Sequence, residues 1–200
     1  MKLKQLLTAI EYRAEQVPDV NITDLVYDSR KAVPGCAFVC LRGANADGHK
    51  YAKTAAEKGA AVIIAEEPVE APVPVILTDN TRLALAYLSA EFFGHPAEQM
   101  HVIGITGTKG KTTTAFMMRS ILEAAGHKTG VIGTIGVLYG DTLVQTDNTT
   151  PENYEVQKFM RQMVAAPVTY TLPAFLNAPD SSTTALVLPF ATFTTRSATP

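Results

Sequence analysis

Short apolar runs alternate with stretches of helical periodicity along the first 95 residues. Leu3, Leu6, Leu7 and Ile10 recur at helical spacing, which predicts a helix over residues 1–16. Apolar runs of strand length follow at 24–30, 37–43, 60–67 and 73–79. Helical stretches lie between or after them, at 47–60 with Gly59 as its stop and at 80–96 with Asn80 or Thr81 as its cap. This alternation predicts an α/β sheet in a first domain, residues 1–95.

A second α/β unit begins with the β-branched run "HVIGIT" at 101–106. A glycine-rich loop, a helix over 112–125 and a strand over 128–136 are expected next. Residues 137–145 predict a hairpin, and 151–166 predict a helix with Pro151 in its first turn, where its missing N–H is harmless. Strand, loop, helix and strand in this order are typical of a P-loop domain, here residues 96–166.

The pattern changes after Ala166. Residues 167–200 hold eight threonines, five prolines, no glycine and two charged side chains, and neither periodicity persists. We interpret 167–200 as an aberrant or disordered tail outside the fold. A shift of reading frame near Ala166 and a natural low-complexity tail are the two explanations that the sequence leaves open.

Composition narrows the classes of partner. A net charge of −2 gives no reason to expect nucleic acid or an anionic membrane. No apolar run reaches the roughly 18 residues of a membrane span, and the N-terminal segment lacks a signal-peptide core, so we expect a cytoplasmic protein. Cys36 and Cys40 form neither a CxxC pair nor part of a zinc cluster and are interpreted as reduced, half-buried cysteines. His49 and His95 are interpreted as surface histidines.

The candidate chemistry lies in "GITGTKGKTTT", residues 104–114. A P-loop wraps phosphate in backbone N–H groups at a helix N-terminus, with a lysine for the terminal phosphates and a hydroxyl for Mg²⁺. Gly110, Lys111 and Thr112 supply that ending. The usual spacing would place the first glycine at 105, where this chain has Ile105. The alternative is a glycine-rich turn with a solvated lysine, but a strand before and a helix after favour a nucleotide phosphate site.

The shortened loop "TGTKGKTTT" resembles that of the Mur ligase superfamily, ATP-dependent enzymes that join amino acids or peptides to a carboxylate. Residues 26–66, with Asp28-Ser29-Arg30 and Asp47-Gly48, are similar to the uridine-binding N-terminal domain of the family. Residues 147–164 are similar to its substrate-binding Thr-Thr segment. Within the superfamily, the set looks most like the UDP-N-acetylmuramoyl-tripeptide synthetases, which add the third residue of the peptidoglycan stem peptide. The implied fold is a small N-terminal α/β domain followed by a truncated central domain of P-loop type.

The resemblance implies a role for particular residues. The ATP phosphates would contact Gly107, Thr108, Lys109, Gly110, Lys111, Thr112 and Thr113. Lys111 would stabilise the transferring phosphate and Thr112 would help bind Mg²⁺, while Lys109 stands where many relatives have Asn. The UDP-sugar substrate would contact Tyr27, Ser29, Ala44, Asn45, Ala46, Asn148, Thr149 and Thr150. From the residues alone, Asp28-Ser29-Arg30 is also an ordinary turn, and Thr149-Thr150 is also a helix cap.

The resemblance also implies what the chain does not contain. The family continues with a Glu-Val-Ser-Ser segment that helps bind magnesium, a carbamylated lysine and a third domain for the incoming amino acid. The parent reaction uses ATP, UDP-MurNAc-dipeptide and an amino acid, in a protein that we expect to be a monomer. We therefore expect the 200-residue chain to lack turnover. The alternatives are another ligase of the superfamily and a noncatalytic protein that binds a nucleotide or a UDP-sugar.

Overall fold

The computed structural model describes residues 1–43, 46–145 and 151–174, and the chain divides into two units, Met1–Phe92 and Phe93–Pro200. The boundary falls close to the expected end of the first domain at residue 95. Within the described residues, no helix combines the length and the apolar character that crossing a bilayer requires.

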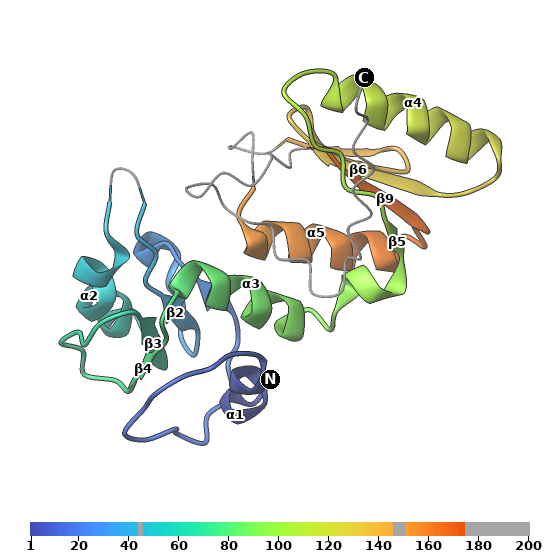
Figure 1. Ribbon diagram of the computed structural model, residues 1–200. Coiled ribbons are helices and arrows are strands. Elements are labelled where there is room, and N and C mark those ends of the chain that lie inside the picture. The colour runs from blue at the N-terminus through green and yellow to red at the C-terminus, as the bar shows by residue number, and fades with distance from the viewer. Residues whose placement is uncertain (44–45, 146–150, 175–200) are drawn as a thin grey trace. The chain divides into compact units, whose positions relative to one another are not determined.

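A parallel sheet in the order β1-β2-β3-β4 forms the centre of the first unit (Figure 1). Its strands are β1 (Leu25–Val26), β2 (Ala37–Val39), β3 (Val62–Ala65) and β4 (Val75–Leu77). Every residue of β2 and β3 is buried, as is typical of parallel strands with both faces covered. On one face, Phe38 and Ile63 pack with Ala52 and Ala55 of α2 (Ala52–Glu57). The predicted α/β fold class is confirmed.

Helices connect these strands and cover their ends. They are α1 (Leu3–Leu6), η1 (Leu7–Ala9), η2 (Ser29–Lys31), η3 (Gly48–Tyr51), α2 and α3 (Thr81–Phe92). Asn80 caps α3, because its Oδ1 accepts a hydrogen bond of 2.9 Å from the Leu83 N–H. The α1 and η1 helices pack against α3, which accounts for the burial of Leu3, Leu6 and Leu7.

The predicted helix over 1–16 is too long. Helical structure ends at Ala9, and Ile10 already has an extended backbone. The chain then pairs with β4, where Arg13 and Leu77 exchange two backbone hydrogen bonds of 2.8 Å. Pairing with the exposed edge of a sheet satisfies the backbone groups of this segment, and a local pattern of leucines does not report such pairing.

A five-stranded sheet in the order β5-β9-β6-β7-β8 forms the second unit. Its strands are β5 (His101–Val102), β6 (Thr129–Gly133), β7 (Gly136–Tyr139), β8 (Thr142–Val144) and β9 (Tyr170–Pro173). β5, β9 and β6 run parallel, while β6, β7 and β8 are antiparallel neighbours. The predicted hairpin over 137–145 is therefore confirmed, as β7 and β8.

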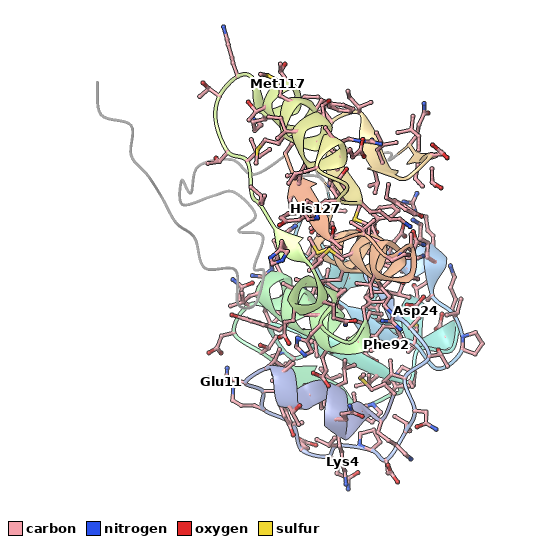
Figure 2. All side chains as sticks on the ribbon, turned by 90° about the vertical axis from the view of Figure 1, so that its right-hand side faces the viewer. Lys4, Glu11, Asp24, Phe92, Met117 and His127 are labelled. Atoms are coloured by element: carbon pink, nitrogen blue, oxygen red, sulfur yellow. The ribbon has the colours of Figure 1, made fainter. Side chains whose placement is uncertain are left out.

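Helices lie on both faces of this second sheet, with α4 (Lys111–Ala124) on one side and α5 (Asn153–Ala165) on the other (Figure 1). Alternate residues of β6 face the two helices, because Val131 packs with the side chains of α4 and Ile132 with those of α5. Figure 2 shows Met117 on the outer face of α4, where it is 62% exposed. A short 3-10 helix, η4 (Pro96–Gln99), precedes β5.

Two details of the second unit differ from what its sequence predicts. The helix expected from Pro151 begins at Asn153 with Glu152 as its N-cap, so Pro151 precedes the helix. The tail expected from residue 167 begins too early, because β9 (Tyr170–Pro173) pairs with both β5 and β6 in the middle of the sheet. Thr171 and Leu172 are fully buried. Buried parallel strands usually read as continuous apolar runs, but Tyr170–Pro173 is neither continuously apolar nor alternating, and so this segment gave no strand signal.

Candidate functional site

The candidate phosphate loop, residues 106–110, connects the end of β5 to the start of α4. Ile103 and Ile105 extend β5 alongside β9, since their N–H groups donate to the carbonyls of Thr171 and Pro173 at 2.9 and 2.8 Å. The loop therefore starts at the carboxyl edge of three parallel strands. Open α/β sheets bind ligands at this edge.

Backbone conformation explains the glycines of the loop. Gly107 has φ +150° and Gly110 has φ +80°, both in the region that side chains with a Cβ rarely adopt. Gly110 is the N-cap of α4, and its carbonyl accepts a hydrogen bond of 2.9 Å from the Thr114 N–H. The loop is thus built from glycines at 107 and 110, without the glycine at 105 that the usual P-loop spacing requires.

The start of α4 carries partial positive charge that no acidic residue of its first turn offsets. Helix geometry leaves the N–H groups of Lys111, Thr112 and Thr113 without an acceptor inside the helix. Gly110 provides no side chain to cap them. All of residues 106–110 are exposed, so an anion can reach these donors. The arrangement fits a phosphate group.

Lys111 lies across this loop. Its Nζ donates a 2.5 Å hydrogen bond to the Gly107 carbonyl, so the ammonium group is held over the loop and not extended into solvent. Thr112 is half-buried beside it and also lines an apolar cavity of about 220 Å³ with Phe116 and Val131. A phosphate needs donors that the apolar walls of this cavity do not provide, so the exposed loop is the better candidate for a phosphate.

The structure brings together the whole set expected to contact ATP. This set is Gly107, Thr108, Lys109, Gly110, Lys111, Thr112 and Thr113, contiguous around the N-terminus of α4. Lys109 is exposed on the loop. The set could hold a nucleotide phosphate, and the Thr112 hydroxyl is of the type that binds a magnesium ion next to it.

Residues expected to contact the UDP-sugar follow neighbouring strands of the first sheet. Tyr27 comes directly after β1, and Ser29 begins η2. Ala46 follows β2, where its carbonyl accepts a hydrogen bond of 2.8 Å from the Gly43 N–H. Because β1 and β2 are adjacent and parallel, these residues share one edge of the sheet. The remaining expected contacts, Ala44, Asn45, Asn148, Thr149 and Thr150, lie outside the described residues.

Asp28 fixes the start of η2 between Tyr27 and Ser29. Its Oδ1 accepts a hydrogen bond of 2.9 Å from the Arg30 N–H, and its Oδ2 accepts one of 2.8 Å from Arg30 Nη2. The Arg30 side chain therefore holds the pKa of the Asp28 carboxyl below its usual value. The Asp-Ser-Arg sequence does form the turn and helix cap that we considered, and this turn places Ser29 at the sheet edge.

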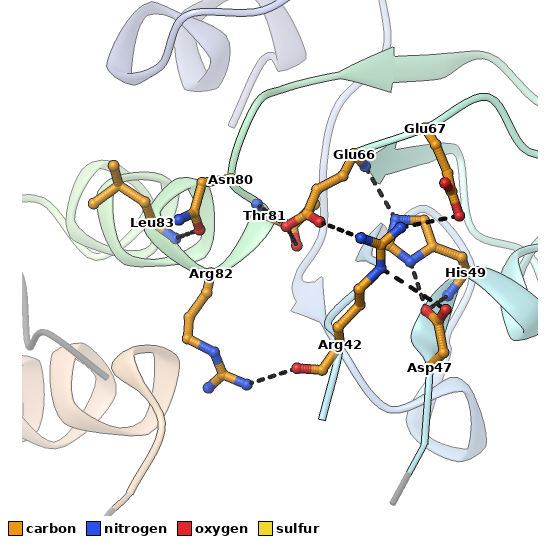
Figure 3. Close-up of polar contacts among 9 residues, drawn as sticks. All are labelled: Arg42, Asp47, His49, Glu66, Glu67, Asn80, Thr81, Arg82 and Leu83. Atoms are coloured by element: carbon orange, nitrogen blue, oxygen red, sulfur yellow. Dashed lines mark hydrogen bonds and ion pairs between the residues drawn. The ribbon is translucent and has the colours of Figure 1, made fainter. Parts of the chain in front are cut away.

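The interpretation of His49 as a surface residue is wrong. His49 is buried, and Figure 3 shows its ring between Asp47 and the backbone of Glu66. The Glu66 N–H donates to His49 Nε2 at 3.1 Å, so Nδ1 carries the proton and donates to Asp47 Oδ1 at 2.6 Å. The His49 ring and the His49 backbone N–H both donate to Asp47 Oδ1, and these two hydrogen bonds hold the pKa of the Asp47 carboxyl below its usual value.

Asp47, His49 and Glu67 place potential metal ligands within 4.8 Å of one another. Both ring nitrogens of His49 already take part in protein hydrogen bonds, and Arg42 lies 3.0 Å from Glu67. A cation would compete with that guanidinium and would need one of the ring nitrogens. The cluster is a hydrogen-bonded ion network and not a metal centre. The sequence signal that could have found it is Asp-Gly-His at the start of the short helix η3, on the far side of the turn that follows β2.

Both cysteines are fully buried in the core of the first unit, deeper than the half-buried position that the sequence predicted. Cys36 and Cys40 are free and buried, and they belong to the same hydrophobic cluster as Phe38. Burial raises the pKa of both thiols, that of Cys40 to about 12. Neither thiol has the exposed, electropositive environment that a reactive cysteine needs.

Two family models match this chain, one in each unit. The model of the Mur ligase family, catalytic domain, matches residues 21–93, and that of the Mur ligase middle domain matches residues 105–172. The chain belongs to the Mur ligase family. The middle-domain match of this Mur ligase ends within β9, which again places residues 167–172 inside the fold.

Individual relatives agree with this assignment. The chain is 48% identical over 168 residues to a UDP-N-acetylmuramoyl-L-alanyl-D-glutamate–2,6-diaminopimelate ligase from Bacillus licheniformis, covering 82% of this chain and 34% of the relative. A solved structure of a ligase with the same name matches with a TM-score of 0.68 at 21% identity, over 86% of this chain and 36% of that one. MurF from Acinetobacter baumannii matches with a TM-score of 0.61 at 29% identity, over 88% and 35%. This Mur ligase chain spans about a third of the length of the relatives that it matches.

Proposed function

We propose that this chain carries the UDP-sugar site and the ATP-phosphate site of a ligase that adds the third amino acid to UDP-MurNAc-L-Ala-D-Glu in peptidoglycan synthesis. The observation that carries the proposal is the 48% identity to a ligase named for this substrate, over a span that includes both units. That relative is named for 2,6-diaminopimelate, and we propose the same incoming amino acid. The proposed ligase is cytoplasmic and monomeric.

The proposed reaction has two steps. In the first, the terminal phosphoryl group of ATP moves to the D-glutamyl carboxylate, which gives an acyl phosphate and ADP. In the second, the amino group of diaminopimelate attacks the acyl carbon, phosphate leaves with the electron pair of the C–O bond, and the amine loses a proton. Positioning and charge stabilisation are the main tasks of a protein in phosphoryl transfer.

The residues at the start of α4 suit the first step. The N–H groups of Lys111, Thr112 and Thr113 would hold phosphate oxygens, and the Lys111 ammonium would exchange its hydrogen bond to Gly107 for the transferring phosphate. Thr112 would hold Mg²⁺, which when bound offsets the charge between ATP and the attacking carboxylate. Thr108 and Lys109 would contribute backbone groups from the exposed loop.

The residues at the edge of the first sheet suit the UDP-sugar. Tyr27, Ser29 and the turn through Ala46 lie after adjacent strands, and we propose that they bind the uridine end of the substrate. We propose that Ala44 and Asn45 also contact the UDP-sugar. Asn148, Thr149 and Thr150 would hold the diphosphate or the sugar.

Calorimetric titration of the 200-residue chain with UDP-MurNAc-L-Ala-D-Glu, UDP and MurNAc tests this function. We expect the two uridine compounds to bind and MurNAc alone not to bind. NMR shifts caused by UDP should fall on Tyr27, Ser29 and Ala46. The proposal is wrong if neither uridine compound binds, or if the shifts avoid the first unit.

A further inference from the structure

A network of hydrogen bonds and ion pairs joins the turn after β2 to the end of β3 and the start of α3; His49 is buried within it, while the charged side chains around it are partly exposed. Arg42 contacts three carboxylates, with its guanidinium nitrogens 3.8 Å from Asp47, 3.3 Å from Glu66 and 3.0 Å from Glu67 (Figure 3). His49 adds its hydrogen bonds to Asp47 and to the Glu66 backbone. The network therefore includes residues on both sides of the turn.

The two sides of this turn are held in register by their backbones. Arg42 and Asp47 form an antiparallel bridge, the Gly43 N–H donates to the Ala46 carbonyl at 2.8 Å, and the Gly48 N–H donates to the Leu41 carbonyl at 2.8 Å. These hydrogen bonds fix residues 41–43 and 46–48 relative to each other. What fixes it to the rest of the unit is the set of side chains at its base.

Glu66 is the point at which the turn meets α3. Its Oε1 accepts hydrogen bonds from the Thr81 N–H at 3.0 Å and from the Thr81 hydroxyl at 2.9 Å, so it caps the start of that helix. Its Oε2 lies 3.3 Å from Arg42, and its backbone N–H donates to His49. The position of the turn is thus tied to the two elements that follow it in the chain.

We propose that His49 is a positioning residue for the UDP-sugar site. A neutral imidazole is the one side chain here that donates to the Asp47 carboxylate with one nitrogen and accepts from the Glu66 backbone with the other. It holds the second side of the turn, which includes Ala46, against the end of β3. This inference rests on the proposed function, because it assumes that the turn contacts the UDP-sugar.

Substitutions at 49 separate this role from the packing role of an ordinary buried histidine. His49→Leu fills a similar volume and removes both hydrogen bonds. His49→Gln keeps an acceptor near the position of Nε2, and His49→Asn keeps a donor near the position of Nδ1. His127→Leu is the matched control, because His127 is exposed after α4 in the second unit.

The assay is the affinity of each variant of the 200-residue chain for UDP, with the melting temperature and the affinity for ATP measured on the same samples. We expect His49→Leu to bind UDP about tenfold more weakly, the effect of losing roughly one net hydrogen bond. His49→Gln should recover part of that loss, while His127→Leu and the affinity of all variants for ATP should match the unsubstituted chain. In that chain, ¹⁵N NMR should show the Nδ1–H tautomer of His49, and its ring signals should shift when UDP is added.

The outcomes are distinguishable. Unchanged UDP affinity in a folded His49→Leu overturns the positioning role and leaves the proposed function standing. If the leucine variant does not fold, equal UDP affinities for the glutamine variant, the asparagine variant and the unsubstituted chain overturn the role. Failure of the unsubstituted chain to bind UDP overturns the proposed function and this inference together.

Discussion

Replacing Gly48 with alanine should destabilise the first unit far more than the same change at Gly43, five residues earlier in the same turn. A Cβ at 48 would lie 2.7 Å from the Leu41 nitrogen, 2.9 Å from the Leu41 oxygen and 3.1 Å from the Cys40 carbonyl carbon. These are backbone atoms just past the end of the central strand β2, and they cannot rotate away as a side chain does. At Gly43 the nearest atom is the Ala46 oxygen at 3.4 Å, an ordinary contact.

The size of the effect follows from these contacts. Overpacking costs about 1–3 kcal/mol, and rigid backbone neighbours place Gly48→Ala near the upper end of that range. Separation of the two segments would also weaken the Gly48 N–H bond to the Leu41 carbonyl, worth about 1 kcal/mol net. A loss of about 3 kcal/mol lowers the melting temperature of a unit of this size by roughly 12 °C or more. Gly43→Ala should stay within about 0.5 kcal/mol of the unsubstituted chain.

Thermal unfolding followed by circular dichroism, with urea unfolding of the same three proteins, measures the difference. Because both substitutions remove the flexibility of one glycine from the unfolded chain, that contribution cancels in the comparison. Equal melting temperatures for the two alanine variants would refute the argument that the turn is packed directly against β2.

Three further results are expected. Ellman's reagent at pH 8 should leave Cys36 and Cys40 unmodified in the folded chain and should titrate two thiols in urea. Because burial raises the pKa of both thiols, the stability that they contribute should be present below pH about 8.5 and should fall at higher pH. Because the folded pKa of Asp47 is lowered, its contribution to the free energy of unfolding is present above its ordinary pKa of 3.8 and is lost as the pH falls through the lower folded value. Urea unfolding of Asp47→Asn should therefore show a weaker loss of stability below pH 4 than that of the unsubstituted chain. Asn80→Ala should cost about 1 kcal/mol in urea unfolding through loss of the cap on α3, and Asn80→Ser should recover most of it; equal losses for both would contradict the capping role.

The features that the sequence predicted are those set by local chemistry. The left-handed backbone at Gly107 and Gly110 and the helix that begins at Lys111 could be predicted because they depend on a few consecutive residues. The strands β2 and β3 were recognisable because parallel strands covered on both faces are continuously apolar. Asn80 was recognisable as a cap from its place before an apolar helix.

The features that the sequence did not predict depend on residues far away in the chain. β9 is a strand because β5 and β6 lie on either side of it, and Pro173 at its end gave the opposite signal. His49 is buried because Glu66, 17 residues later, donates to its ring. The first helix is short because Arg13 pairs with Leu77. In each case a tertiary partner decided the outcome.

The central claim is that the start of α4 binds the phosphates of ATP through Lys111. Isothermal titration of the 200-residue chain with ATP and Mg²⁺ tests it most directly, with Lys111→Ala as the probe and the exposed Lys128→Ala as the control of equal charge change. We expect the unsubstituted chain and Lys128→Ala to bind with the same affinity, and Lys111→Ala to bind at least about tenfold more weakly, the loss of one charge-assisted contact to phosphate. Equal affinities for all three proteins, or the absence of ATP binding by the unsubstituted chain, would contradict the claim.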